Sequence, residues 1–143
     1  MASSLDVAQY ILEKMGPLTT IKLQKLVYYS QAWALVWDDE PIFDDEIQAW
    51  ANGPVAPRLF FKHQGQYRID SIPEGDSSRL KDYHKETIDV VIRDYGNKNS
   101  QWLVELSHLE DPWKMARRGC PDGAPCSEII THASMAEYYS GLK

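Results

Sequence analysis

The sequence has few cysteines and no long apolar segment. Only Cys120 and Cys126 occur in 143 residues, and a chain of this length buries about two thirds of its unfolded surface without needing disulfides. The longest apolar run falls far short of the roughly 18 residues that a membrane helix requires, and the opening MASSLDVAQ has neither a basic nor an apolar signal region. We therefore expect a single cytoplasmic domain, residues 1–143, with no membrane partner.

Basic residues are outnumbered: 15 Lys and Arg stand against 21 Asp and Glu, for a net charge of -6. A phosphate backbone would on average be repelled, so no direct binding of nucleic acid is expected. The 43% hydrophobic and 25% charged residues are ordinary for a folded domain, which excludes long disordered or coiled-coil architectures.

Metal-binding patterns are weak. Cys120 and Cys126 flank PDGAP, and this five-residue gap is longer than the two to four residues between paired zinc ligands. His108 and His132 lie on either side, so a four-ligand site can be drawn on paper, but the spacing favours two reduced thiols in a loop. We predict no metal and no cofactor.

Catalytic patterns are equally weak. His84 and Glu86, with the later Cys126, resemble the zinc deaminase signature, but position 129, where that signature places its second cysteine, is Ile. The four histidines fall near predicted helix or cap boundaries, where surface or capping roles are usual. No convergent catalytic set is visible, so we predict that the chain is not an enzyme; a hydrolase or metal enzyme using His84, Glu86, Cys126 and His132 is the remote alternative.

Helical periodicity covers much of the chain. A first amphipathic helix begins after a Ser4 cap and stops at Gly16. Residues 19–37 form a second helix that is apolar over most of its circumference, with Trp33 and Trp37 expected in the core, which predicts a central position in the domain. Lys22 and Lys25 are expected on its solvated stripe. Further helices are predicted near residues 57–64, 78–95, 100–109, 112–118 and 134–139.

Two short segments show strand-like alternation. Ile47–Trp50 and the stretch around Tyr67 and Ile69 are predicted to pair as a two-stranded flap. The predicted fold is therefore mostly α: a compact single-domain helical bundle around a buried central helix, with a small two-stranded β flap.

Between these two segments lies Asn52-Gly-Pro-Val55. Pro54 has no amide hydrogen to offer an anion, while Asn52 and Gly53 tolerate positive φ. A phosphate loop would need several glycines and a Lys-Ser/Thr ending, and neither follows. The stretch is predicted to be a structural corner. It raises the question of whether Trp50, just before it, anchors the corner in the core or serves as a binding hot spot.

Four stretches together resemble the Panacea domain, also called the antitoxin SocA-like domain: KLQKLVYYSQAW (22–33), EPIFDDEIQAWANGPV (40–55), VIRDYGNKNSQWL (91–103) and DPWKMAR (111–117). The resemblance spans residues 22–117, about two thirds of the chain, and its four motifs each carry a tryptophan, with a Gly-Pro corner in the second. It implies a bacterial or phage antitoxin that neutralises a cognate toxin by direct binding. In some members of the family the antitoxin also delivers its toxin to a protease. An adaptor or interaction module for a non-toxin partner is the alternative.

Seven residues are candidates for the toxin interface. Arg58 lies in the first turn of a predicted helix, where the helix dipole disfavours a cation, which hints at a use beyond stability. Arg117 lies one turn after Trp113 and could contact the toxin or, alternatively, pair with a carboxylate of residues 44–46. The acidic residues 38–46 form a predicted solvated loop that could attract a basic toxin. The candidates are Trp50, Asn52, Arg58, Asp44, Asp45, Trp113 and Arg117.

Overall fold

Helices make up most of the computed structural model, which describes residues 1–142. The predicted fold class, mostly α with a small β flap, is confirmed. No helix in residues 1–142 has both the length and the apolarity to cross a membrane. Within the described residues the α-helices are α1 (Ser4–Met15), α2 (Thr20–Trp37), α3 (Pro57–His63), α4 (Asp82–Tyr95), α5 (Ser100–Leu109), α6 (Asp111–Ala116) and α7 (His132–Ser140).

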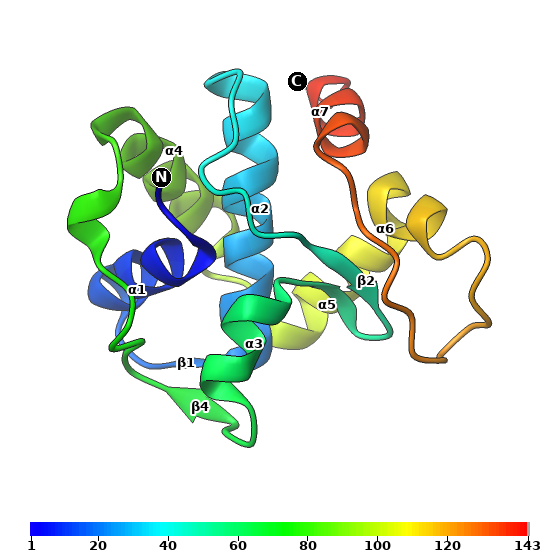
Figure 1. The fold of residues 1–143 in the computed structure, drawn as a ribbon, viewed down its shortest axis with the longest axis horizontal. Coiled ribbons are helices and arrows are strands. Elements are labelled where there is room, and N and C mark those ends of the chain that lie inside the picture. Colours follow the sequence, from blue (N-terminus) through cyan, green and yellow to red (C-terminus); the bar gives the residue numbers. More distant parts are fainter. Residues whose placement is uncertain (143) are drawn as a thin grey trace.

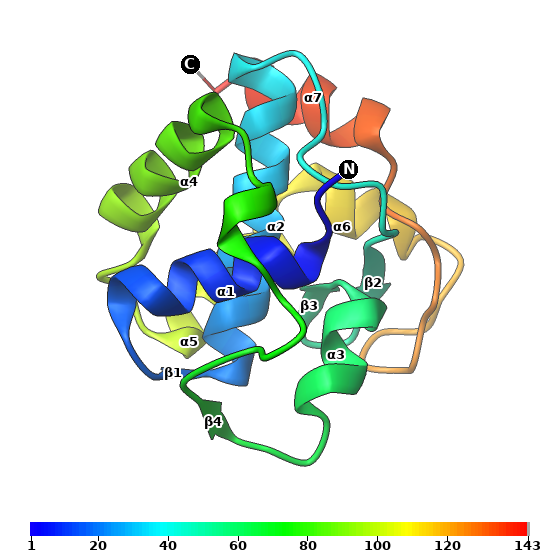
Figure 2. The ribbon, with the colours of Figure 1, turned by 60° about the vertical axis from the view of Figure 1, so that its left-hand side comes forward.

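Helix α2 is the centre of the fold, as predicted. It stands upright in Figure 1 between α1 and α4 on one side and α6 and α7 on the other, and Figure 2 shows α1 crossing it. Every residue from Leu23 to Ala34 is buried, which is the pattern of a helix covered on all sides. The expectation for Trp37 was wrong: it lies in the last turn, stacks on Trp33 with ring centroids 4.8 Å apart, and remains 44% exposed.

A buried carboxylate joins α2 to the C-terminal part of the chain. Glu110, directly before α6, accepts hydrogen bonds from the hydroxyl groups of Tyr29 at 2.6 Å and Tyr139 at 2.8 Å. The Tyr28 and Tyr139 hydroxyl groups lie 3.0 Å apart. Burial raises the pKa of Glu110, while the two tyrosine hydrogen bonds lower it. The aromatic residues of α2 and α7 thus share one polar centre within an otherwise apolar core.

The strand pairing differs from the prediction. Strand β2 (Gln48–Trp50) pairs antiparallel with β3 (Gly53–Val55), and β4 (Arg68–Ile69) pairs instead with β1 (Leu18–Thr19). Because Trp50 faces Gly53 across the pair, Ala51 and Asn52 form a two-residue hairpin turn. This turn brings Gly53–Val55 back onto β2, so β2 has its partner before the chain reaches β4.

Helix ends lie close to the predicted positions. Ser3, one residue earlier than predicted, caps α1 in a capping box with Asp6, and Gly16 ends that helix. The expected helix over 78–95 is split into a 3₁₀ turn, Ser77–Arg79, and α4, because Leu80 and Lys81 adopt extended backbone. Helix α6 starts at Asp111, so the residue before it, Glu110, takes the cap position.

Asn99 caps α5. Its side-chain oxygen accepts a hydrogen bond of 2.8 Å from the backbone N–H of Trp102. We expect Asn99→Ala to lower the free energy of unfolding by about 1 kcal/mol, because the N–H loses its partner. Urea unfolding of Asn99→Ala beside Asn97→Ala, a non-capping neighbour, measures the effect. Equal stability of the two variants would contradict the capping role.

Candidate partner interface and adjoining pocket

The hairpin β2–β3 is held by side chains from two motifs that are far apart from each other in the sequence. Trp113 donates its ring N–H to the Trp50 carbonyl at 2.8 Å, and Arg117 donates to the Ala49 carbonyl at 2.9 Å. From α2, Lys25 donates to the Pro54 carbonyl at 3.0 Å. The KLQK and DPWKMAR motifs therefore converge on the corner motif.

Gln24 fixes the exit of the hairpin. Its amide oxygen accepts from the N–H of Ala56 at 2.9 Å, and its amide nitrogen donates to the Ala56 carbonyl at 3.3 Å. The same nitrogen lies 3.0 Å from Nε2 of His63 on α3. Because these groups are buried, each needs a partner, and the pairing fixes the position at which α3 begins.

Gly53 is required by its conformation and by its surroundings. Its φ is +110°, a region that side-chain-bearing residues rarely adopt. A Cβ at this position would lie 2.6 Å from Cε of Lys25 and 2.8 Å from Oγ of Ser107. The prediction that NGPV is a structural corner is confirmed in part: Asn52 lies in the turn, whereas Gly53–Val55 form strand β3.

Arg117 is part of this support and does not reach the acidic loop. It is 6% exposed and donates to the carbonyls of Ala49, Pro121 and Ala124. The predicted alternative of an ion pair with residues 44–46 is wrong, because the planar guanidinium is fully engaged by loop carbonyls. Its burial also leaves no free side chain for a toxin.

Two tryptophans support the hairpin: Trp50, which lies in β2, and Trp113, which lies in α6. Trp113 is half-buried and stacks on His108 with centroids 4.0 Å apart. Trp50 is half-buried, packs edge-on against Phe60 at 4.8 Å and donates its ring N–H to Gln48. Trp50 therefore anchors the turn, while part of its ring lines an open cavity.

The other interface candidates lie near the start of α3. Asp45 has a side chain that is 6% exposed and accepts hydrogen bonds from the N–H and the hydroxyl of Ser4. The Arg58 guanidinium lies 3.7 Å from it and is 59% exposed. Asp44 and Asn52 are exposed. The structure thus leaves Asp44, Asn52 and Arg58 accessible.

The acidic segment 38–46 is only partly the solvated loop that was predicted. Asp38 accepts a hydrogen bond from the Thr87 hydroxyl at 2.7 Å. Glu40 accepts from Lys81 and from Tyr83, both at 2.9 Å. These bonds attach the loop to α4 and to the residue before it, while Asp39, Asp44 and Glu46 remain exposed.

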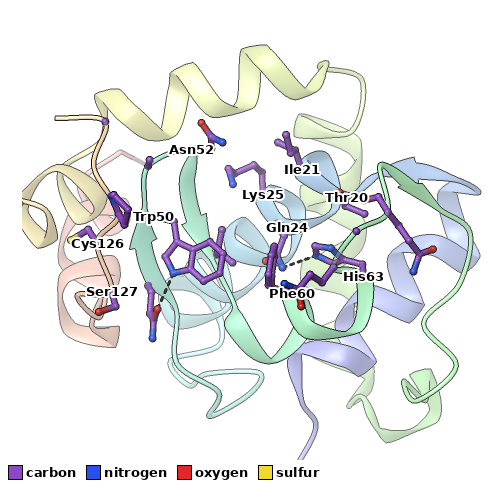
Figure 3. Close-up of a pocket in the computed structure, with 18 residues that line it drawn as sticks. Thr20, Ile21, Gln24, Lys25, Trp50, Asn52, Phe60, His63, Cys126 and Ser127 are labelled. Carbon is purple, nitrogen blue, oxygen red and sulfur yellow. Dashed lines mark hydrogen bonds between the residues drawn. The ribbon is translucent and has the colours of Figure 1, made fainter. Parts of the chain in front are cut away.

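A cavity of about 630 Å³ opens beside the hairpin (Figure 3). The labelled Trp50, Phe60 and His63 lie on its walls, and Cys126 and Ser127 line it from the segment that runs beside β2. Sequence reasoning missed this cavity. Residues 48–66 were predicted as a strand segment, a corner and a helix, and none of these local patterns indicates a cavity.

Lys25, which also lines the cavity, is the largest departure from the predictions. It was expected in solvent but is 1% exposed. Burial lowers its pKa to about 7. The reason is the central position of α2, which leaves no solvated stripe at this level of the helix. Lys22 is half-buried and donates to the Gly96 carbonyl at 2.6 Å.

The histidine and cysteine predictions also need correction. His63 and His84 are 4% and 3% exposed, so they are not surface histidines, and burial lowers the pKa of each. Cys120 and Cys126, predicted as free thiols, form a disulfide. Residue spacing does not reveal that the intervening loop, with Gly123 at a φ of +74°, folds back and brings their Cα atoms to 6.1 Å.

Comparison with known proteins identifies the relationship. The family model described as "Antitoxin SocA-like, Panacea domain" matches residues 23–114, a span that includes α2, the hairpin and Trp113. The chain is also 29% identical over 131 residues to a protein named Antitoxin SocA from Caulobacter vibrioides (strain NA1000 / CB15N), an alignment that covers 79% of this chain and 69% of that protein. No solved structure matches significantly. The chain therefore belongs to the antitoxin SocA-like, Panacea domain family.

Proposed function

We propose that this chain is an antitoxin that neutralises a cognate toxin by binding it directly. The observation that carries the proposal is the family match over residues 23–114, which is supported by the relative named Antitoxin SocA. Within that span the family motifs converge on one rigid hairpin. A preformed surface loses little conformational freedom on binding, which favours tight association.

The toxin would contact the exposed rim beside the hairpin. Asn52 is at the hairpin turn, Asp44 precedes β2, and Arg58 lies at the start of α3. Trp113 and Arg117 would not contact the toxin but would support the hairpin, because both donate hydrogen bonds to its backbone carbonyls. Asp45 would act by orienting Arg58, since its own carboxylate is engaged with Ser4.

The net charge of the chain supports a toxin partner with a basic surface. A net charge of -6 favours a toxin with a basic surface and disfavours direct contact with nucleic acid. Within residues 1–142, no group of three or more His, Cys, Asp or Glu side chains lies together as a metal site would require. We propose that the chain acts in the cytoplasm, by binding and not by catalysis, and that any protease receives the toxin only after this complex forms.

Growth rescue tests the proposal. The chain is co-expressed with the product of the neighbouring reading frame, and the toxin level is followed by immunoblot. Rescue with a co-purifying, undiminished toxin supports direct neutralisation. Rescue with loss of the toxin supports delivery to a protease, and no rescue of a toxic product contradicts the antitoxin role.

Arg58→Ala should separate binding from folding. Arg58 forms an ion pair with Asp45, and its own side chain is largely exposed to solvent. Removing the arginine should therefore change the free energy of unfolding by no more than about 1 kcal/mol. We expect affinity for the toxin to fall about tenfold or more, as for a central arginine of an interface. Alanine is chosen because a Glu at this position would face the carboxylate of Asp45.

Arg93→Ala is the matched control. Arg93 is exposed on α4 and pairs only with its neighbour Asp94 among the described residues. Figure 1 shows α4 across α2 from the hairpin. Titration calorimetry with the toxin should therefore find parent-like affinity for Arg93→Ala. Equal affinities of both variants would remove Arg58 from the interface.

A further inference from the structure

The cavity beside the hairpin contains no acidic side chain among the described residues. Although the chain has 21 Asp and Glu residues, none of those described lines the cavity. The lining includes the cation Lys25 and the neutral polar side chains of Gln24, Asn52 and Ser127. In a protein of net charge -6, this is a local environment suited to an anion.

Lys25 has unused hydrogen-bonding capacity at the wall of this cavity. Its ammonium group has three N–H donors, and among residues 1–142 the Pro54 carbonyl is its one acceptor. Burial is the sole cause of its lowered pKa, so no carboxylate compensates its charge. A buried cation without a counter-charge lowers the stability of the fold. Charged residues in such positions often belong to binding sites.

The other titratable groups near Lys25 do not supply a negative charge. They are His63 on α3 and His108 on α5, and burial together with the charge of Lys25 lowers the pKa of both. Both imidazoles are therefore neutral near pH 7. Of these groups only His63 lines the cavity together with Lys25, so an incoming anion would meet one cation and one neutral ring.

One side of the cavity is apolar. Trp50 and Phe60 meet edge-on at 4.8 Å, and Ile21 and Val55 complete this side. Figure 3 shows the Trp50 ring and Phe60 on the cavity side of the hairpin and α3. A volume of about 630 Å³ is typical of sites for small organic ligands. The ligand should thus combine an anionic group with an aromatic or branched aliphatic group.

We propose that this cavity binds a carboxylate carried on an aromatic or branched aliphatic group, with Lys25 as the counter-ion and Trp50 and Phe60 as the apolar wall. Such a carboxylate occurs on a free organic acid and at the C-terminus of a peptide. The site goes beyond the proposed antitoxin role, which uses the outer rim of the hairpin, and the two share Asn52 at the hairpin turn.

Calorimetric titration with hydrocinnamate tests the proposal on the intact chain. At about pH 8.5, above the Lys25 pKa of about 7, the lysine of the free protein is mostly neutral, and the carboxylate should restore its proton. Binding is therefore expected with uptake of nearly one proton, measured in two buffers of different ionisation enthalpy. At about pH 6 the lysine is already protonated, so uptake should be close to zero. Binding without this pH-dependent uptake overturns the role of Lys25.

The neutral analogue hydrocinnamamide and two lysine variants complete the test. Lys25→Met and the amide should each weaken binding about tenfold or more, since a hydrogen bond to a charged group is lost. Lys22→Met should bind like the parent, because Lys22 lies outside the cavity. Acetyl-alanyl-phenylalanine is titrated in parallel, and the tighter of the two acids identifies the source of the carboxylate. If neither acid binds, the proposal is wrong.

Discussion

Gly53→Val is expected to destabilise the domain by about 3 to 5 kcal/mol, because two costs add. The φ of +110° resists a β-branched residue. The new side chain would also have to displace Lys25 and Ser107, whose atoms lie 2.6 and 2.8 Å from the position of the added Cβ. Since Lys25 belongs to α2 and Ser107 to α5, relief of this contact would disturb the centre of the fold.

Gly65→Val separates the two costs. Gly65 also has a positive φ, +85°, but an added Cβ there meets nothing within 4 Å. This variant should lose only about 1 to 2 kcal/mol, from backbone strain alone. Urea unfolding of both variants gives the comparison. If the free energy of unfolding falls by the same amount in both variants, the close packing around Gly53 makes no contribution to the effect of Gly53→Val.

Lys25→Met is expected to stabilise the domain by about 2 to 4 kcal/mol near pH 7. In the unfolded chain the lysine keeps its proton up to its ordinary pKa of 10.5, whereas in the folded protein it loses the proton above a pKa of about 7. The parent therefore loses stability as the pH falls from about 10 to about 7, and no further below that. Methionine fills similar space and carries no charge. The free energy of unfolding of Lys25→Met, relative to that of the parent, should therefore increase as the pH falls over this range.

Thermal and urea unfolding between about pH 6 and pH 10 measures this difference. Lys22→Met is the control, since Lys22 is only half-buried and its bond to Gly96 lies at the end of α4. It should show a much weaker pH dependence relative to the parent. A Lys25→Met variant that is less stable than the parent throughout this range would mean that the bond to Pro54 outweighs the burial of the charge.

Periodicity was sufficient to predict the helices and the central position of α2. The run from Leu23 to Ala34 is buried along its whole length, and no peripheral position in a domain accommodates such a helix. Local signals such as Gly16 and Asn52 also located a helix end and the turn correctly, because their effects depend on backbone geometry within a few residues.

Side-chain partners could not be predicted in the same way. Lys25 and Arg117 look like surface cations in the sequence, yet each meets a backbone carbonyl of a residue far away along the chain, Pro54 and Ala49 respectively. Pairing of β2 with β3 depended on a two-residue turn, while alternation alone also allowed β2 to pair with β4. The cavity is lined from α2, the hairpin, α3 and residues 123–127, and no local pattern encodes such a combination.

The disulfide bears on how the cavity is kept in shape. Cys126 lies in the cavity wall, and in a reducing cytoplasm the bond to Cys120 would open. Arg117 would still hold the loop, because it donates to the carbonyls of Pro121 and Ala124 at 3.0 and 2.7 Å. The proposed interface and the pocket therefore do not depend on the oxidation state of the two cysteines.

Direct binding is the central claim, and titration calorimetry of the purified chain with the product of its neighbouring reading frame measures it. We predict a saturable complex of defined stoichiometry with a dissociation constant of about nanomolar order, weakened by Arg58→Ala and unchanged by Arg93→Ala. The absence of any complex with a folded, toxic partner would contradict the account.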